Sequence, residues 1–157
     1  MNQPSNTDQA WQLEYTDASS LRGDVVASLL TDVSKTIGSR HVMVRDVEGS
    51  GLLLERLAEL GGRRQMTSVS ELTQVLGGVS QLDWGEIAFG AADDDAKELR
   101  QLDPVSVVAR VQVLVRAVDS NYLYLYGRSK ELIERLQTIF PGARVSRRPL
   151  GELEFPD

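Results

Sequence analysis

The sequence contains no cysteine, a single histidine and few aromatic residues, which make up 6% of the chain. Without cysteine there can be no disulfide framework, no thiolate zinc site and no cysteine nucleophile. The lone histidine, His41, cannot form a His-rich metal site, and no Gly-x-Ser-x-Gly motif accompanies it. We therefore expect a non-catalytic protein with no cofactor and no metal, in a reducing compartment such as the cytoplasm.

Long hydrophobic runs and a basic charge balance are also missing. No stretch approaches the ~18 apolar residues that a membrane span needs, and residues 1–9 lack the features of a signal peptide. The net charge is -6, so phosphate backbones and anionic lipids would repel the domain as a whole. We expect neither nucleic acid nor a membrane as partner. The 14 arginines outnumber three lysines, but base composition explains this bias equally well, so it carries no functional weight.

What the chain does contain is mainly aliphatic, because 41% of its 157 residues are hydrophobic. This length suits one domain that buries about 70% of the surface exposed by the unfolded chain. We expect a flexible tail over residues 1–10, a single domain over residues 11–148 and an acidic tail over residues 149–157. Leu153 and Phe155 are apolar anchors in that last tail.

Hydrophobic periodicity predicts the elements of the domain. Apolar residues at the three-and-four spacing of a helical face predict helices over residues 21–37, 53–60, 69–76, 93–102 and 130–140. Alternating or valine-rich segments predict strands over residues 11–15, 42–47, 84–89, 111–118, 122–126 and 143–147. Helix caps are predicted at Ser19 or Ser20, Ser50, Ser68, the acidic run at residues 93–95, and Ser129. Gly38 is expected to end the first long helix, and Pro104 to end the helix that begins near residue 93.

The order of these elements is β-α-β-α-α-β-α-β-β-α-β. Mixed helices and strands with a late hairpin predict an α+β fold, a mixed α/β sandwich with helices packed on the sheet. The first β-α-β unit is expected to bring two parallel strands together, whereas the hairpin must be antiparallel. The sequence therefore predicts a mixed sheet.

The hairpin centres on residues 122–126, where three tyrosines alternate with two leucines. A three-residue loop at 119–121, with Asn121 left-handed, pairs Val118 with Tyr122, Arg116 with Tyr124 and Leu114 with Tyr126. This register separates an all-apolar face from an amphipathic one, and a slip by one residue would mix them. The hairpin therefore has a defined tyrosine face.

Two interpretations of this tyrosine face remain open. Helices can cover it, so that Tyr122, Tyr124 and Tyr126 belong to a second packed layer. Alternatively it is a recognition surface, because tyrosine combines a large apolar area with a polar tip. In either case Arg116 can stack on Tyr124 across the strands.

A second candidate partner-binding segment is formed by Asp83, Trp84 and Glu86. A tryptophan flanked by carboxylates could anchor a basic partner, or it could be a core residue with solvated neighbours. The turn at residues 49–51 resembles a phosphate-binding loop in its glycines alone. It lacks the third glycine and the lysine of the known motifs, so a tight turn is the better interpretation.

The leading functional hypothesis is a non-catalytic cytoplasmic protein that binds another protein, most specifically an acidic inhibitor of the immunity type that neutralises a basic toxin. The first alternative is a dimeric secretion-chaperone-like or adaptor subunit. The second is a small-molecule or nucleotide-binding enzyme that uses the turn at residues 49–51.

Overall fold

The structure is a computed structural model that describes residues 8–16 and 20–157. Within these residues, seven strands form one sheet in the order β3-β2-β4-β5-β6-β1-β7, and every neighbouring pair is antiparallel. The strands are β1 (Gln9–Thr16), β2 (His41–Ser50), β3 (Thr67–Ser68), β4 (Gln81–Gly90), β5 (Val113–Val118), β6 (Tyr122–Gly127) and β7 (Arg144–Pro149).

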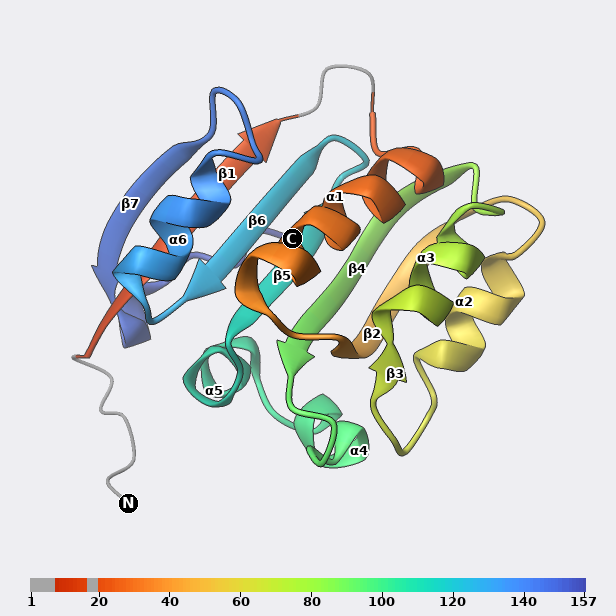
Figure 1. The fold of residues 1–157 in the computed structure, drawn as a ribbon, viewed down its shortest axis with the longest axis horizontal. Helices are drawn as coiled ribbons and strands as arrows, with labels where there is room; N and C mark the ends of the chain where they lie inside the picture. The colour runs from red at the N-terminus through yellow and green to blue at the C-terminus, as the bar shows by residue number, and fades with distance from the viewer. Residues whose placement is uncertain (1–7, 17–19) are drawn as a thin grey trace.

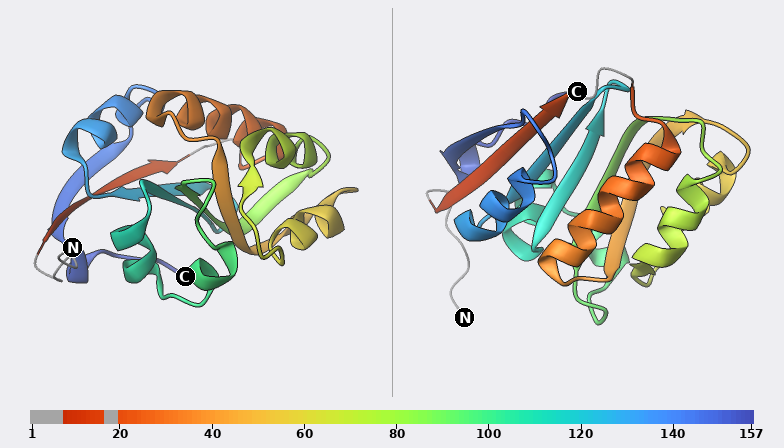
Figure 2. Two further views of the ribbon diagram at one scale, coloured as in Figure 1. Left: turned by 60° about the horizontal axis from the view of Figure 1, so that its bottom comes forward. Right: turned by 45° about the horizontal axis from the view of Figure 1, so that its top comes forward.

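Helices cover both faces of this sheet (Figures 1 and 2). One face carries α1 (Gly23–Ile37), α2 (Leu54–Leu60), α3 (Val69–Leu76) and α6 (Lys130–Gln137). The other carries α4 (Ala96–Arg100), α5 (Pro104–Arg110), the short helix η1 (Leu150–Glu152) and the C-terminal segment that follows it. None of the described helices is long and apolar enough to cross a membrane.

Two apolar cores result, one on each face of the sheet. The first contains Leu13, Leu30 and Leu72, and the second contains Met43 and Tyr126. Because side chains alternate along a strand, each central strand contributes to both cores. The predicted α+β class is confirmed.

The predicted mixed sheet is wrong, because every ladder in the described sheet is antiparallel. Strands β1 and β2 do run in the same direction, but β4, β5 and β6 lie between them. Local periodicity predicts that a strand exists and cannot say which strand becomes its neighbour.

Several helix ends follow the predicted chemistry. Ser68 accepts a hydrogen bond from the Glu71 N–H at 3.1 Å, and Ser129 accepts one from the Leu132 N–H at 3.2 Å. Gly38 ends α1 in the left-handed conformation, with φ of 71°. These caps satisfy backbone groups that have no partner within the helix.

Two predicted caps are wrong. Ser20 has φ of 70° and lies outside α1, which begins at Gly23 after a cap residue, Arg22, without a side-chain bond. Ser19 lies outside the described residues. Ser50 is the last residue of β2 and does not cap α2. The residue at the N-terminal cap of α2 is Leu53, which makes no side-chain hydrogen bond there.

The segment after Pro104 differs most from the prediction. Pro104 begins α5 instead of closing a helix, and Asp103 caps it by accepting the Ser106 N–H at 2.8 Å. Proline suits the first turn of a helix because its missing N–H would have no partner there. The sequence pattern predicts no helix over residues 105–110, where valine lowers the local helix propensity, and the structure has a helix there.

The hairpin register is confirmed residue by residue. Val118 pairs with Tyr122, Arg116 with Tyr124 and Leu114 with Tyr126. The loop conformation differs, since Asp119 and Ser120 have positive φ in place of Asn121. The separation of apolar and amphipathic side chains onto different faces therefore determines the register more than the conformation of the loop does.

The C-terminal segment packs across the tyrosine face. Leu153 is buried, and Phe155 lies against the Tyr126 ring with a centroid separation of 4.7 Å. The Tyr126 hydroxyl donates to the Glu154 carbonyl at 2.7 Å. The two predicted anchors thus hold this segment on the sheet.

Candidate functional site

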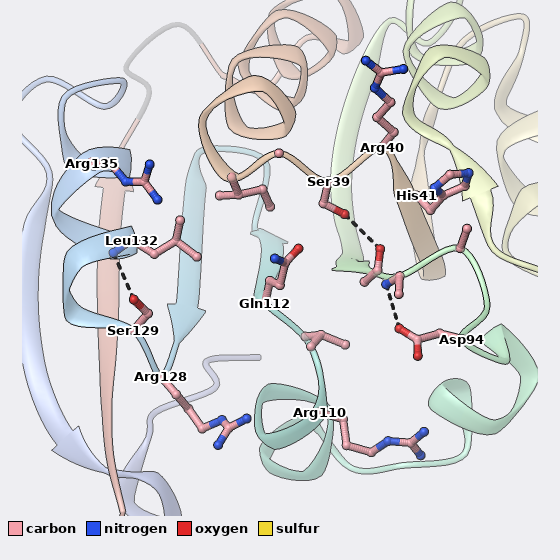
Figure 3. Close-up of a pocket in the computed structure, with 16 residues that line it drawn as sticks. Ser39, Arg40, His41, Asp94, Arg110, Gln112, Arg128, Ser129, Leu132 and Arg135 are labelled. Atoms are coloured by element: carbon pink, nitrogen blue, oxygen red, sulfur yellow. Dashed lines mark hydrogen bonds between the residues drawn. The ribbon is translucent and has the colours of Figure 1, made fainter.

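A cleft of about 930 Å³ opens at one end of the sheet, where four central strands begin or end. His41 opens β2 and pairs with Gly90, the last residue of β4. The Gln112 N–H, just before β5, donates to the Phe89 carbonyl, and Arg128 directly follows β6. Because the four strands are successively antiparallel, these ends lie on one side of the molecule. The end of α1 and the first turns of α6 complete the walls (Figure 3).

Four exposed arginines surround the opening: Arg40, Arg110, Arg128 and Arg135. Arg40 precedes β2, Arg110 ends α5, Arg128 follows β6 and Arg135 lies on α6, so each comes from a different part of the fold. Figure 3 shows Arg128 and Arg135 on the α6 side and Arg40 on the β2 side. We call this site the arginine cleft.

Three of these arginines have no anionic partner in the described part of the chain. No ion pair or side-chain hydrogen bond involves the guanidinium group of Arg40, Arg128 or Arg135 there. Arg110 differs, because it pairs with Glu98 at 2.8 Å.

Negative charge in the cleft is limited to one carboxylate among its described lining residues, that of Asp94. Asp94 Oδ2 accepts the Ala91 N–H at 2.9 Å, which closes the loop after β4. A Cβ on Gly90 would lie 2.5 Å from the same oxygen, so glycine permits this closure. The cleft as a whole remains strongly cationic, on a chain whose net charge is -6.

The two hydroxyl groups on the cleft wall make hydrogen bonds within the fold. The Ser39 hydroxyl donates to the Gly90 carbonyl at 2.9 Å, and the Ser129 hydroxyl caps α6. Over the described ranges, no hydrogen bond joins the His41 ring to a hydroxyl or a carboxylate. Nucleophilic catalysis needs a base within hydrogen-bonding distance of the nucleophile, and this lining does not supply one. What it offers is a set of donors for an anion.

The residues predicted to bind a partner lie elsewhere, around a second cavity of about 590 Å³. Glu86 is only 5% exposed and lies between Arg45 and Arg116, which reach it from β2 and β5. Arg116 Nε is 2.7 Å from Glu86 Oε2, although its N–H is not aligned for a hydrogen bond, so this contact is ionic. We call these three residues the covered network.

Further contacts attach the covered network to its surroundings. Arg45 Nη1 donates to the Leu102 carbonyl at 2.7 Å, beyond the end of α4. Arg116 Nη1 donates to the Pro156 carbonyl at 3.0 Å, and its guanidinium lies 5.5 Å from the Phe155 ring centre. The aromatic partner of Arg116 is therefore Phe155 in the C-terminal segment, and the predicted stacking on Tyr124 is not found.

The tyrosine face is largely covered by α5 and the C-terminal segment. Tyr126 is 0% exposed and Tyr124 is 8% exposed, whereas Tyr122 is half-buried. Burial raises the pKa of Tyr126 and the pKa of Tyr124 above the ordinary value. Tyr124 and Tyr126 therefore belong to a second packed layer, which is the first of the two interpretations of the tyrosine face.

Trp84 and Asp83 keep some exposure beside this face. Trp84 is half-buried and lines the second cavity, while Asp83 accepts a hydrogen bond from the Ser120 hydroxyl at 2.6 Å. These two residues, Tyr122 and Arg116, whose side chain is 11% exposed, are the members of the predicted set that retain accessible surface. Their role in binding stays a prediction.

The glycine turn at residues 49–51 is occupied by backbone. A Cβ on Gly49 would lie 2.2 Å from the Gln81 carbonyl oxygen, and one on Gly51 would lie 2.4 Å from the Ser80 nitrogen. The glycines thus allow two stretches of chain to approach closely. Their role in the described structure is this close approach of backbone segments.

No three His, Asp or Glu residues of the described ranges are grouped to hold a metal ion. A comparison of the chain with known protein families, with curated proteins and with solved structures gives no match.

Proposed function

We propose that this chain is a non-catalytic binding domain and that the arginine cleft holds an anionic partner. The observation that carries the proposal is the grouping of Arg40, Arg128 and Arg135 around one opening without a counter-ion from the described chain. Like charges that gather without partners repel each other, and an anionic ligand would relieve this repulsion.

The openness of the site supports binding in preference to chemistry. All four arginines are exposed, so a ligand would remain accessible to water. Enzymes usually exclude water from the reacting groups, and small-molecule sites usually enclose most of their ligand. A broad cationic cleft suits a partner that contributes a surface or a segment.

Within this class, we keep the toxin-neutralising inhibitor of the cytoplasm as our specific proposal. The absence of cysteine supports a reducing compartment, and the surface outside the cleft is more acidic than the chain average. That acidic remainder would steer a partner of net basic charge toward the protein, and an acidic part of the same partner would then occupy the cleft. A gene for a secreted toxin beside the gene for this chain would support this proposal, and its absence would count against it.

Anion binding is tested by thermal unfolding with tripolyphosphate at constant ionic strength. A ligand that binds the folded state raises the melting temperature by mass action. We expect the rise for the natural chain and for the matched control R64S/R147S, because those exposed arginines lie outside the cleft and also lack ion partners in the described chain. We expect no rise for R128S/R135S. An equal response from all three proteins would refute the proposal.

A further inference from the structure

We propose that the ligand of the arginine cleft is an extended acidic segment of another protein, with carboxylates at several nearby positions. This inference rests on the proposed function and identifies the class of partner. It depends on three features of the cleft: its length, its lining and the spread of its charges.

The length of the cleft favours an extended ligand. Arg40 directly precedes β2 and Arg128 directly follows β6, and the strands β4 and β5 lie between these two. Three strand spacings of ~4.8 Å separate them, so the backbone positions that carry these two arginines are about 14 Å apart. An extended peptide rises ~3.3 Å per residue and covers this distance with about four residues.

The spread of the arginines argues against a compact anion. Arg128 and Arg135 lie on one side of the cleft and Arg40 on the other (Figure 3). A single phosphate group hydrogen-bonds only donors within ~3 Å of its oxygens. It would therefore leave part of the cationic rim unpaired, whereas successive carboxylates could reach both sides.

The lining argues against a nucleic acid strand. Single-stranded nucleic acids are bound by pairing their phosphates with a basic groove and by stacking their bases on aromatic side chains. No phenylalanine, tyrosine or tryptophan is among the described residues that line the cleft. Only His41 and the arginines of this lining could stack on a base, so the cleft lacks the large aromatic surfaces of such grooves.

The same lining suits a polypeptide. Ile37, Val111 and Leu132 give the cleft apolar surface between its charges. The exposed Gln112 side chain forms no hydrogen bond within the described chain, and its amide can both donate to and accept from a peptide backbone. Acidic residues alternating with small apolar ones therefore match the cleft.

The test compares two probes of similar charge on the full chain. The two probes are the peptide octaglutamate and the oligonucleotide nonathymidylate, each labelled with fluorescein. The protein is titrated into each probe at low salt, and binding is followed by fluorescence anisotropy. We expect octaglutamate to bind at least tenfold more tightly than nonathymidylate. Exposed ion pairs are individually weak, so R128S/R135S should lower the octaglutamate affinity about tenfold. The control R64S/R147S should change it less than twofold.

The two proposals fail in different ways. If nonathymidylate binds as tightly as octaglutamate or more tightly, and R128S/R135S weakens it, the cleft binds anions and the inference about an acidic polypeptide is wrong. If neither probe responds to R128S/R135S more than to R64S/R147S, the proposed function itself is wrong. Circular dichroism of both variants verifies that they are folded.

Discussion

The covered network and the arginine cleft contain the same cationic group in opposite surroundings. Arg45 and Arg116 have side chains that are 8% and 11% exposed, and both contact the buried carboxylate of Glu86. Arg128 and Arg135 are exposed and contact no carboxylate in the described chain. An arginine removed from water needs a partner, whereas one in water does not. The first pair therefore belongs to the fold, and the second pair is free to bind a ligand.

This difference also changes which residues are candidates for recognition. The tyrosines suggest a binding surface by their composition, yet α5 and the C-terminal segment cover two of them. The arginines of the cleft are distant in sequence and carry no motif, yet they surround the larger opening. We therefore propose recognition at accessible groups without internal partners and not at the covered tyrosines.

The largest expected effect is on the covered network. Glu86→Gln removes the carboxylate that Arg116 contacts and leaves Arg45 with only the exposed Asp46, 3.7 Å away, so we expect the free energy of unfolding to fall by about 3–5 kcal/mol. Urea denaturation measures it. The control Glu48→Gln changes an exposed carboxylate at the same cavity and should alter the value by less than about 0.5 kcal/mol. If the two variants lower the free energy of unfolding equally, the buried carboxylate of Glu86 contributes no more to stability than an exposed one, and the comparison is wrong.

The C-terminal segment should contribute the next largest effect. Phe155→Ala removes a half-buried ring that contacts Tyr126 and Arg116. A fully buried phenylalanine costs 3–5 kcal/mol on truncation, so we expect about 2 kcal/mol for this partly exposed one. The exposed neighbour Glu152 provides the control variant Glu152→Ala. If both variants are as stable as the natural chain, the segment does not hold the tyrosine face covered.

The contact between Tyr126 and the C-terminal segment can also be measured through its dependence on pH. Tyr126→Phe removes the hydrogen bond to the Glu154 carbonyl, and we expect a loss of about 1 kcal/mol at neutral pH. Burial raises the pKa of this phenol above its ordinary 10.0, so the unfolded chain ionises first. The contribution of the neutral phenol is present in full below pH 10 and is lost as the pH rises through the folded-state pKa. We expect the free energy of unfolding, measured at increasing pH, to fall above pH 10 for the natural chain and to fall less for Tyr126→Phe.

The arginine cleft should have the smallest effect on stability. R128S/R135S removes two exposed cations that form no ion pair within the described chain, so the free energy of unfolding should change by less than about 0.5 kcal/mol. Urea denaturation of this variant beside Glu86→Gln gives the contrast directly. A loss of several kcal/mol would mean that these arginines support the fold.

Local features of the fold were predictable because they depend on neighbouring residues. The caps at Ser68 and Ser129 follow from hydrogen-bonding side chains before an apolar helical pattern. The hairpin register follows from the requirement that apolar and amphipathic side chains occupy different faces. Helix α5 is not predicted, since valine has a low helix propensity, although Asp103 and Pro104 form a proper helix start.

The arginine cleft could not be derived in the same way. Arg40 and Arg135 become neighbours of one opening only through the strand order, in which β2 and β6 enclose β4 and β5. Strand order depends on contacts between distant segments, and local periodicity does not encode it. The excess of arginine over lysine was a visible signal, but composition alone does not show which arginines lack partners.

The most direct test of the account is the site at which octaglutamate binds to the full chain. Amide chemical shifts of the ¹⁵N-labelled protein, followed during a titration, map that site. We predict saturable shifts in the segments 37–41, 90–94, 110–112 and 128–135, which contain the residues that line the cleft. Shifts that cluster instead around Trp84 and Tyr122 would contradict the account, because they would place recognition beside the covered network.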